Sequence, residues 1–142
     1  MNYIKLFAIK QMFEGIGIMV KLKTVLIIDD DIFVSKTLQI GLRENGYITI
    51  CAKNGIEGLE VIKNQNPDIV ICDRVMPEFS GFQLLKTLRE DHPSFTSPFI
   101  FISSLDDQRD INAVAELSPT SYLTKPINLD DLLLALKSSL AE

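Results

Sequence analysis

Short apolar runs alternate with longer helix-like segments along most of this chain. The runs are rich in valine, isoleucine and phenylalanine, and the segments between them repeat apolar residues at helical spacing. The runs predict strands over Val25–Ile28, Tyr47–Ala52, Asp68–Cys72, Phe99–Ile102 and Ser121–Thr124. The intervening segments predict helices over about Ile32–Asn45, Ile56–Lys63, Gly81–Arg89, Asp106–Leu117 and Leu129–Leu140.

The alternation of strand and helix predicts an α/β fold. Right-handed crossovers leave few topologies other than a parallel sheet with helices on both faces, and continuous apolar runs suit strands buried on both sides. We therefore expect a doubly wound, five-stranded parallel sheet with five helices. Ligands of such folds bind beyond the carboxyl ends of the strands.

Polar residues of chemical interest follow four of the five predicted strands. They are Asp29-Asp30-Asp31, Asp73, Ser103-Ser104 and Thr124-Lys125-Pro126. Because the carboxyl ends of parallel strands meet at one edge, these side chains are expected to share a site. Acids at a helix start could merely cap the helix, and Asp31 fits that role better than a ligand role.

Converging carboxylates repel one another, and a hard divalent cation with oxygen ligands relieves the repulsion. Mg²⁺ is the cation expected here, with Asp30 and Asp73 as direct ligands and Asp29 acting through water. The cation would leave Asp73 able to attack phosphorus and form an aspartyl phosphate. Lys125 would neutralise a phosphoryl oxygen, and the Ser103 hydroxyl would donate to another.

Length, net charge and cysteine content limit the classes of partner and the cellular compartment to be expected. The chain has 142 residues, enough for one domain, and a formal net charge of −5, which argues against a basic nucleic-acid-binding face. Cys51 and Cys72 lie in separate predicted strands without a secretory segment, so a reduced, cytoplasmic protein is expected. The N-terminal apolar stretch is interrupted by charges and falls short of a membrane span.

On the motifs described above, residues Lys23 to Leu140 resemble the receiver domain of two-component response regulators. In its extent the chain is similar to the single-domain chemotaxis regulator. The acid pair follows the first strand, and Asp73-Arg-Val-Met-Pro-Glu-Phe-Ser-Gly81 fits the family pattern D-x-x-M-P-x-x-x-G. Ser103 follows Phe-Ile-Phe-Ile, and Tyr122-Leu-Thr-Lys125-Pro126 completes the set in the family's order.

The resemblance implies a flavodoxin-like sheet of order 2-1-3-4-5 and a role for each matching residue. Asp73 would be the phosphoacceptor, Ser103 and Tyr122 the switch pair, and Lys125 the phosphate-binding lysine. The metal ligands would be Asp29, Asp30, Asp73 and the backbone carbonyl of Val75. A histidine kinase or histidine phosphotransfer protein would donate the phosphoryl group. Output would pass to a protein partner through the face formed by 106–117, 121–124 and 129–140.

The sequence departs from the family pattern after Ser103, where Ser104 replaces the common alanine but is still small enough to admit phosphate, and again at 118–119. Ser118-Pro119 replaces the usual Gly-Ala pair, and Ser118, which precedes proline, is expected to be extended. Val75 and Leu105 flank the expected path of attacking water, and neither side chain can orient water by hydrogen bonding. We therefore predict slow self-hydrolysis of the phosphorylated protein.

Two other functions compete with this interpretation. A haloacid-dehalogenase-like phosphatase would use Asp29 as nucleophile with Ser103, Lys125 and Asp106-Asp107, but Phe33 stands where it needs threonine or valine. A phosphorylation-independent binding module would keep the fold without using the acid site, and the complete set of site residues argues against it.

Residues 1–20 lie outside the family pattern, and 21–142 are interpreted as the receiver domain. The extension could be an amphipathic segment that packs through Ile4, Phe7, Ile9 and Phe13. Alternatively, translation starts at Met19, and this interpretation is slightly favoured. Finding Met1 by N-terminal mass analysis of the native protein would refute it.

Overall fold

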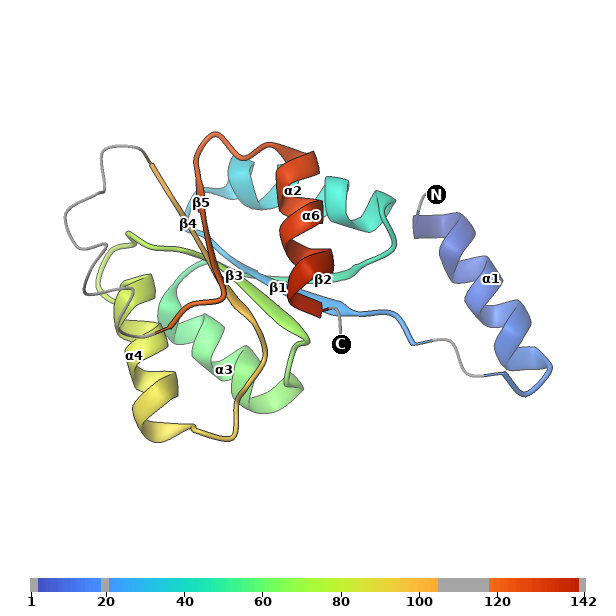
Figure 1. Ribbon diagram of the computed structural model, residues 1–142, viewed down its shortest axis with the longest axis horizontal. Coiled ribbons are helices and arrows are strands. Elements are labelled where there is room, and N and C mark those ends of the chain that lie inside the picture. The colour runs from blue at the N-terminus through green and yellow to red at the C-terminus, as the bar shows by residue number, and fades with distance from the viewer. Residues whose placement is uncertain (1–2, 19–20, 105–117, 141–142) are drawn as a thin grey trace.

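The structure is a computed structural model that describes residues 3–18, 21–104 and 118–140. Its centre is a five-stranded parallel sheet of order β2-β1-β3-β4-β5, as predicted (Figure 1). The strands are β1 (Thr24–Ile28), β2 (Ile48–Ala52), β3 (Ile69–Asp73), β4 (Phe99–Ser103) and β5 (Ser121–Thr124). They match the sequence prediction within one residue at each end.

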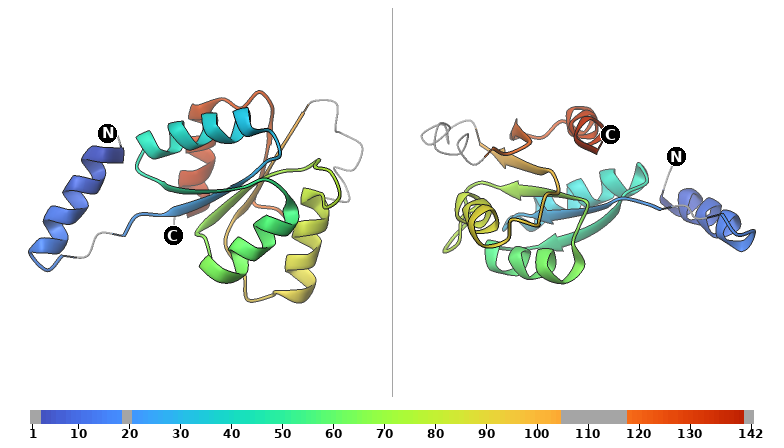
Figure 2. Two further views of the ribbon diagram at one scale, coloured as in Figure 1. Left: turned by 180° about the vertical axis from the view of Figure 1, so that it is seen from behind. Right: turned by 60° about the horizontal axis from the view of Figure 1, so that its bottom comes forward.

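Helices cover both faces of the sheet, as Figure 2 shows. On one face lie α2 (Ile32–Glu44) and α6 (Leu129–Leu140), and on the other lie α3 (Gly55–Gln65) and α4 (Gly81–Asp91). The helix predicted at 106–117 lies outside the described residues. A further helix, α1 (Tyr3–Gly15), precedes the sheet.

Successive strand residues supply two separate cores, because side chains of a strand alternate between the faces of the sheet. In β1, Val25 and Ile27 join the core under α2 and α6, whereas Leu26 and Ile28 join the core under α3 and α4. All four are fully buried. This double burial explains why the strand is apolar at every position.

Local capping sets where the helices begin. Asp31 caps α2 by accepting hydrogen bonds from the backbone N–H groups of Phe33 and Val34, so its predicted capping role is confirmed. Ser80 and Gln83 form a reciprocal capping box at the start of α4. This cap fixes the end of the loop that leaves β3.

The prediction that Ser118 is extended is wrong. Its φ is +52°, in the left-handed region, although Pro119 follows it. The preference of residues before proline is a local steric bias, which contacts with distant elements override here. The Ser118 carbonyl accepts a hydrogen bond from Nη2 of Arg89 at 3.3 Å, and the N–H of Thr120 donates to the Phe99 carbonyl at 2.9 Å.

Helix α1 stands beside the domain, beyond the amino ends of the strands (Figure 1). Leu6 lies against Gly46, which follows α2 with a φ of +90°. Ile4 and Phe7 are exposed, and Ile9 and Phe13 are partly buried, so of the four proposed packing residues only the second pair turns away from solvent. In the described ranges, no helix combines the length and apolarity required to cross a membrane.

Candidate metal centre at the carboxyl edge of the sheet

Three carboxylates meet where β1 and β3 end. Asp29 and Asp30 follow β1, Asp73 is the last residue of β3, and these two strands are neighbours. One carboxylate oxygen from each residue lies within 4.8 Å of the others. Asp29 and Asp73 are buried, whereas Asp30 is exposed. The adjacency of the strands therefore produces the acid cluster that the sequence predicts.

The burial of Asp29 makes the cluster suited to a cation. Its Oδ1 accepts a hydrogen bond from the N–H of Asp31 at 2.8 Å, whereas its buried Oδ2 is balanced by an ion pair with the Lys125 ammonium at 3.0 Å. A buried carboxylate oxygen without a donor is costly unless a positive charge faces it. The oxygen-only donor set and its net negative charge fit Mg²⁺.

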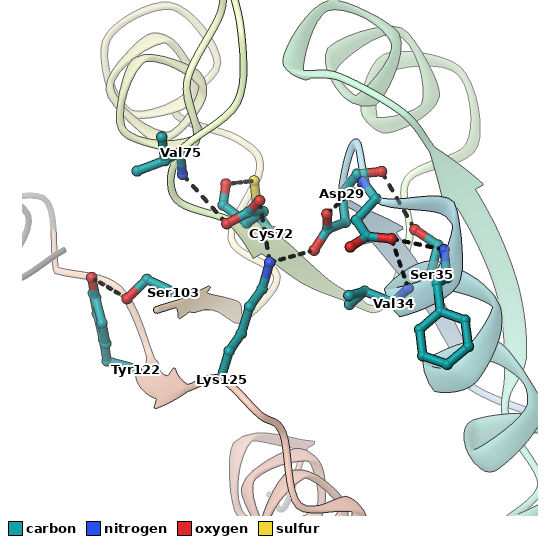
Figure 3. Close-up of polar contacts among 11 residues, drawn as sticks. Asp29, Val34, Ser35, Cys72, Val75, Ser103, Tyr122 and Lys125 are labelled. Atoms are coloured by element: carbon teal, nitrogen blue, oxygen red, sulfur yellow. Dashed lines mark hydrogen bonds and ion pairs between the residues drawn. The ribbon is translucent and has the colours of Figure 1, made fainter. Parts of the chain in front are cut away.

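Lys125, which follows the edge strand β5, supplies a positive charge to the acids. Its Nζ lies 3.0 Å from Oδ2 of Asp29 and 3.4 Å from Oδ2 of Asp73. Figure 3 shows the side chain reaching from the end of β5 toward Asp29. The Lys125 N–H donates to the Ser103 carbonyl at 2.7 Å, which fixes the backbone from which the ammonium reaches.

The site raises the affinity of Asp73 for a proton. Burial and then the negative charge of Asp29 raise the pKa of Asp73 from 3.8 to about 6, although the charge of Lys125 and the Val75 N–H oppose the rise. Burial lowers the pKa of Lys125, but its contact with Asp29 and the two carboxylate charges outweigh this, so the net pKa is raised. Lys125 is therefore charged when Asp73 is ionised.

This pKa predicts a pH dependence of stability in Mg²⁺-free buffer. The folded state binds the Asp73 proton more tightly than the unfolded chain, whose carboxyl pKa is near 3.8, so the contribution of Asp73 falls as pH rises from about 3.8 to about 6. Urea unfolding across this window should show the free energy of unfolding of wild type declining relative to Asp73→Asn. A constant difference between the two proteins would contradict the shift.

Ser103 and Tyr122 form a second polar pair beside the acids. Ser103 ends β4 and is buried, and its Oγ donates to the Tyr122 hydroxyl at 3.0 Å (Figure 3). The Tyr122 ring is 5.9 Å from the Phe101 ring, centroid to centroid. The two residues predicted to act as a switch are therefore in direct contact.

The β3–α4 loop begins beside the Asp73 carboxylate. The Val75 N–H lies 3.4 Å from Oδ1 of Asp73, while the Val75 side chain is 52% exposed. The N–H of Gly81 donates to the Arg74 carbonyl at 3.0 Å, which closes the loop. A Cβ at Gly81 would collide with the Asp73 carbonyl, so only glycine lets α4 begin this close to the acid.

Comparison with known proteins assigns the family. The family described as "Response regulator receiver domain" matches residues 25–137. The chain belongs to the response regulator receiver family. Receiver domains are phosphoacceptor switches of two-component systems rather than enzymes in the usual sense, and they bind Mg²⁺ at an acidic pocket. In this receiver domain, Asp29, Asp30 and Asp73 form an acid cluster.

Individual relatives agree with this assignment. Protein PilH of Pseudomonas aeruginosa is 31% identical over 117 residues, which cover 82% of this receiver chain and 97% of PilH. Response regulator MprA of Mycobacterium sp. (strain KMS) is 31% identical over 116 residues, but the chain spans only about half of its length.

Solved structures show the same fold. A putative response regulator from Chloroflexus aurantiacus superposes with a TM-score of 0.79 at 34% identity, covering 86% of this chain and all of that one. Chemotaxis protein CheY4 of Vibrio cholerae superposes with a TM-score of 0.77 at 26% identity, covering 84% of this chain and all of CheY4.

The structure also shows contacts of this receiver domain that the sequence did not indicate. The Ser35 hydroxyl of α2 donates to the Asp29 carbonyl at 3.4 Å, and a small polar residue on the apolar face of that helix was the only signal. Phe79 packs against Gly55 at the start of α3. Leu105 and the acids Asp106-Asp107 lie outside the described residues.

Proposed function

We propose that this receiver domain accepts a phosphoryl group on Asp73 from a histidine kinase or histidine phosphotransfer protein and signals through a protein partner. The observation that carries the proposal is the position of the Asp73 carboxylate. It lies within 4.8 Å of the other two acids and 3.4 Å from the Lys125 ammonium. That arrangement suits a nucleophile that must approach an anionic phosphoryl group.

The proposed transfer is a single displacement at phosphorus. An Asp73 oxygen forms the new O–P bond while the N–P bond of the donor phosphohistidine breaks, and the imidazole nitrogen keeps the electron pair. Bound Mg²⁺ would supply charge neutralisation for the transferring oxygens, held by Asp29, Asp30, Asp73 and the Val75 carbonyl. Asp73 acts in its ionised form.

The neighbouring groups have distinct proposed roles. The Lys125 ammonium neutralises the charge on one oxygen of the phosphoryl group, and the Ser103 hydroxyl donates a hydrogen bond to another oxygen. The Ser103 and Tyr122 hydroxyls are 3.0 Å apart, and turning the single Ser103 proton to the phosphoryl group would break a bond donated to Tyr122. The loss of this bond would report phosphorylation to Tyr122, which is partly exposed on the edge strand β5.

The proposed output surface includes β5 and α6. Leu134 of α6 is 66% exposed, which leaves an apolar side chain available to a partner there. The remaining part of the surface predicted from the sequence, 106–117, lies outside the described residues. Phosphorylation would act on this surface by favouring one arrangement of the switch pair through its differential contacts.

Mapping the phosphorylated residue tests the proposal. The wild-type chain is incubated with Mg²⁺ and acetyl phosphate, the acyl phosphate is trapped by borohydride reduction, and the modified peptide is sequenced. We expect the label on Asp73. A label on Asp29 would instead support the haloacid-dehalogenase-like alternative, and no label at all would support the phosphorylation-independent module.

The Val75 side chain predicts the lifetime of the phosphorylated state. Val75 is half exposed beside Asp73 and offers no hydrogen bond to an attacking water. Replacing it by asparagine, which can orient water, should shorten the phosphoryl lifetime by about tenfold, less than the ~10²–10⁴-fold effect of a general acid or base because the amide transfers no proton. Loss of label after removal of the donor measures it, with Val75→Leu as the apolar control. An unchanged or longer lifetime in Val75→Asn would count against the prediction.

A further inference from the structure

The first turn of α3 contacts both chain segments that carry the proposed metal ligands. A Cβ at Gly55 would collide with Cδ1 of Phe79 and lie 2.8 Å from the Phe79 carbonyl oxygen, so this glycine admits the β3–α4 loop. One turn later, a Cβ at Gly58 would collide with Cδ1 of Ile28, the residue before Asp29. Two glycines thus let one helix touch both segments.

The loop between Asp73 and α4 needs such support. The Phe79 N–H donates to the Pro77 carbonyl at 2.7 Å across Glu78, whose φ is +69°. This three-residue turn is strained for a residue other than glycine. A strained conformation persists only where the surrounding contacts determine it.

Two apolar side chains of the loop make the contacts that hold this strained conformation. Met76 is buried in the core shared with α3 and α4, and the Phe79 ring packs against the same core while resting on Gly55. Val75, exposed and without a core contact of its own, lies next to Met76. Hydrogen bonds of the Arg74 and Val75 N–H groups hold the chain before the Val75 carbonyl, and the anchored residues Met76 and Phe79 hold it after.

We infer that Phe79 and Gly55 are positioning residues of the metal centre: their contact holds the β3–α4 loop where the Val75 carbonyl can serve as a ligand. This inference rests on the proposed function, because it assigns the loop contact to the same Mg²⁺ site. It requires the Phe79 backbone, and not only its ring, to lie against Gly55. A Cβ added at Gly55 would lie 2.8 Å from the Phe79 carbonyl oxygen, so the backbone of the loop, and not only the ring, would have to move.

Calorimetric titration with Mg²⁺ tests the inference on the full chain. Gly55→Ala should weaken Mg²⁺ binding by about tenfold, the lower end of the range for groups that orient metal ligands. Gly41→Ala is the matched control. Gly41 is also a buried helical glycine, but the three atoms nearest to its Cβ would belong to the Leu129 side chain, at 2.9 Å and above, on the opposite face of the sheet.

A second pair of variants keeps the test decisive if Gly55→Ala does not fold. Phe79→Leu retains an apolar anchor and should bind Mg²⁺ like wild type, whereas Phe79→Ala removes the anchor and should bind about tenfold more weakly. Urea unfolding in Mg²⁺-free buffer gives the stability of every variant. Binding that follows stability across all variants, including Gly41→Ala, would overturn the inference, because the contact would then be merely structural.

Two other outcomes also decide the question. Unchanged Mg²⁺ affinity in both Gly55→Ala and Phe79→Ala would overturn the positioning role while leaving the proposed function intact. Absence of Mg²⁺ binding by wild type would instead remove the proposed function, and the inference with it. The two failures are therefore distinguishable in one set of titrations.

Discussion

Replacing Asp73 by asparagine is expected to abolish phosphoryl uptake completely while leaving the fold at least as stable. The amide has nearly the shape of the carboxylate but provides no anionic oxygen to form the acyl phosphate. The substitution also removes a charge that burial and Asp29 disfavour, as the raised pKa of Asp73 shows. The urea midpoint in Mg²⁺-free buffer at neutral pH should therefore rise.

The measurement is incorporation of label from acetyl phosphate with Mg²⁺, followed over time. Asp91→Asn is the matched control, because it is the same chemical substitution at an exposed position, at the end of α4 and remote from the acids. The control should be phosphorylated at the wild-type rate. Substantial label on the Asp73→Asn protein would assign the acceptor role to another residue.

Replacing Lys125 by methionine is expected to slow phosphorylation by about a hundredfold or more, the usual effect of removing one donor that stabilises developing charge. Methionine keeps the length of the side chain but loses the ammonium that faces Asp29 and Asp73. The pKa of Asp73 should rise further, because Lys125 is one of the groups that lower it.

The same change should also destabilise the Mg²⁺-free protein. The Asp29 side chain is fully buried, so loss of its ion-pair partner leaves an uncompensated buried charge. Lys86→Met is the control, since Lys86 is exposed on α4. Initial rates of phosphorylation at saturating Mg²⁺, with urea unfolding of the same proteins, provide the two readouts. A wild-type rate in Lys125→Met would contradict the proposed role of the lysine.

Much of this site could be predicted because residues that follow the strands of a parallel sheet lie together at its carboxyl edge. Asp29 and Asp73 each follow an apolar run, and parallel strands bring such residues to one edge whatever the details of packing. Ser103 and Lys125 follow the same rule at the ends of β4 and β5. The acid cluster therefore agrees with the prediction, whereas the ion pairs of Lys125 with Asp29 and Asp73 are a finding of the structure.

Other features could not be predicted, because contacts between distant segments decide them. Ser118 is left-handed despite Pro119, and its carbonyl is held by Arg89, far away in sequence. The packing of Phe79 on Gly55 joins a loop and a helix whose sequences show no sign of the partnership. The place of α1 beside Gly46 is a contact of the same kind.

The sequence by itself determined the class of fold and the residues gathered at the edge of its sheet. Both follow from periodicity and chain direction, which are local properties that each strand and helix carries independently. Tertiary structure alone decided how the β3–α4 loop is held and which side chains face one another across it. Those outcomes depend on close packing between segments remote in sequence, where a single methyl group at Gly55 decides whether the loop fits.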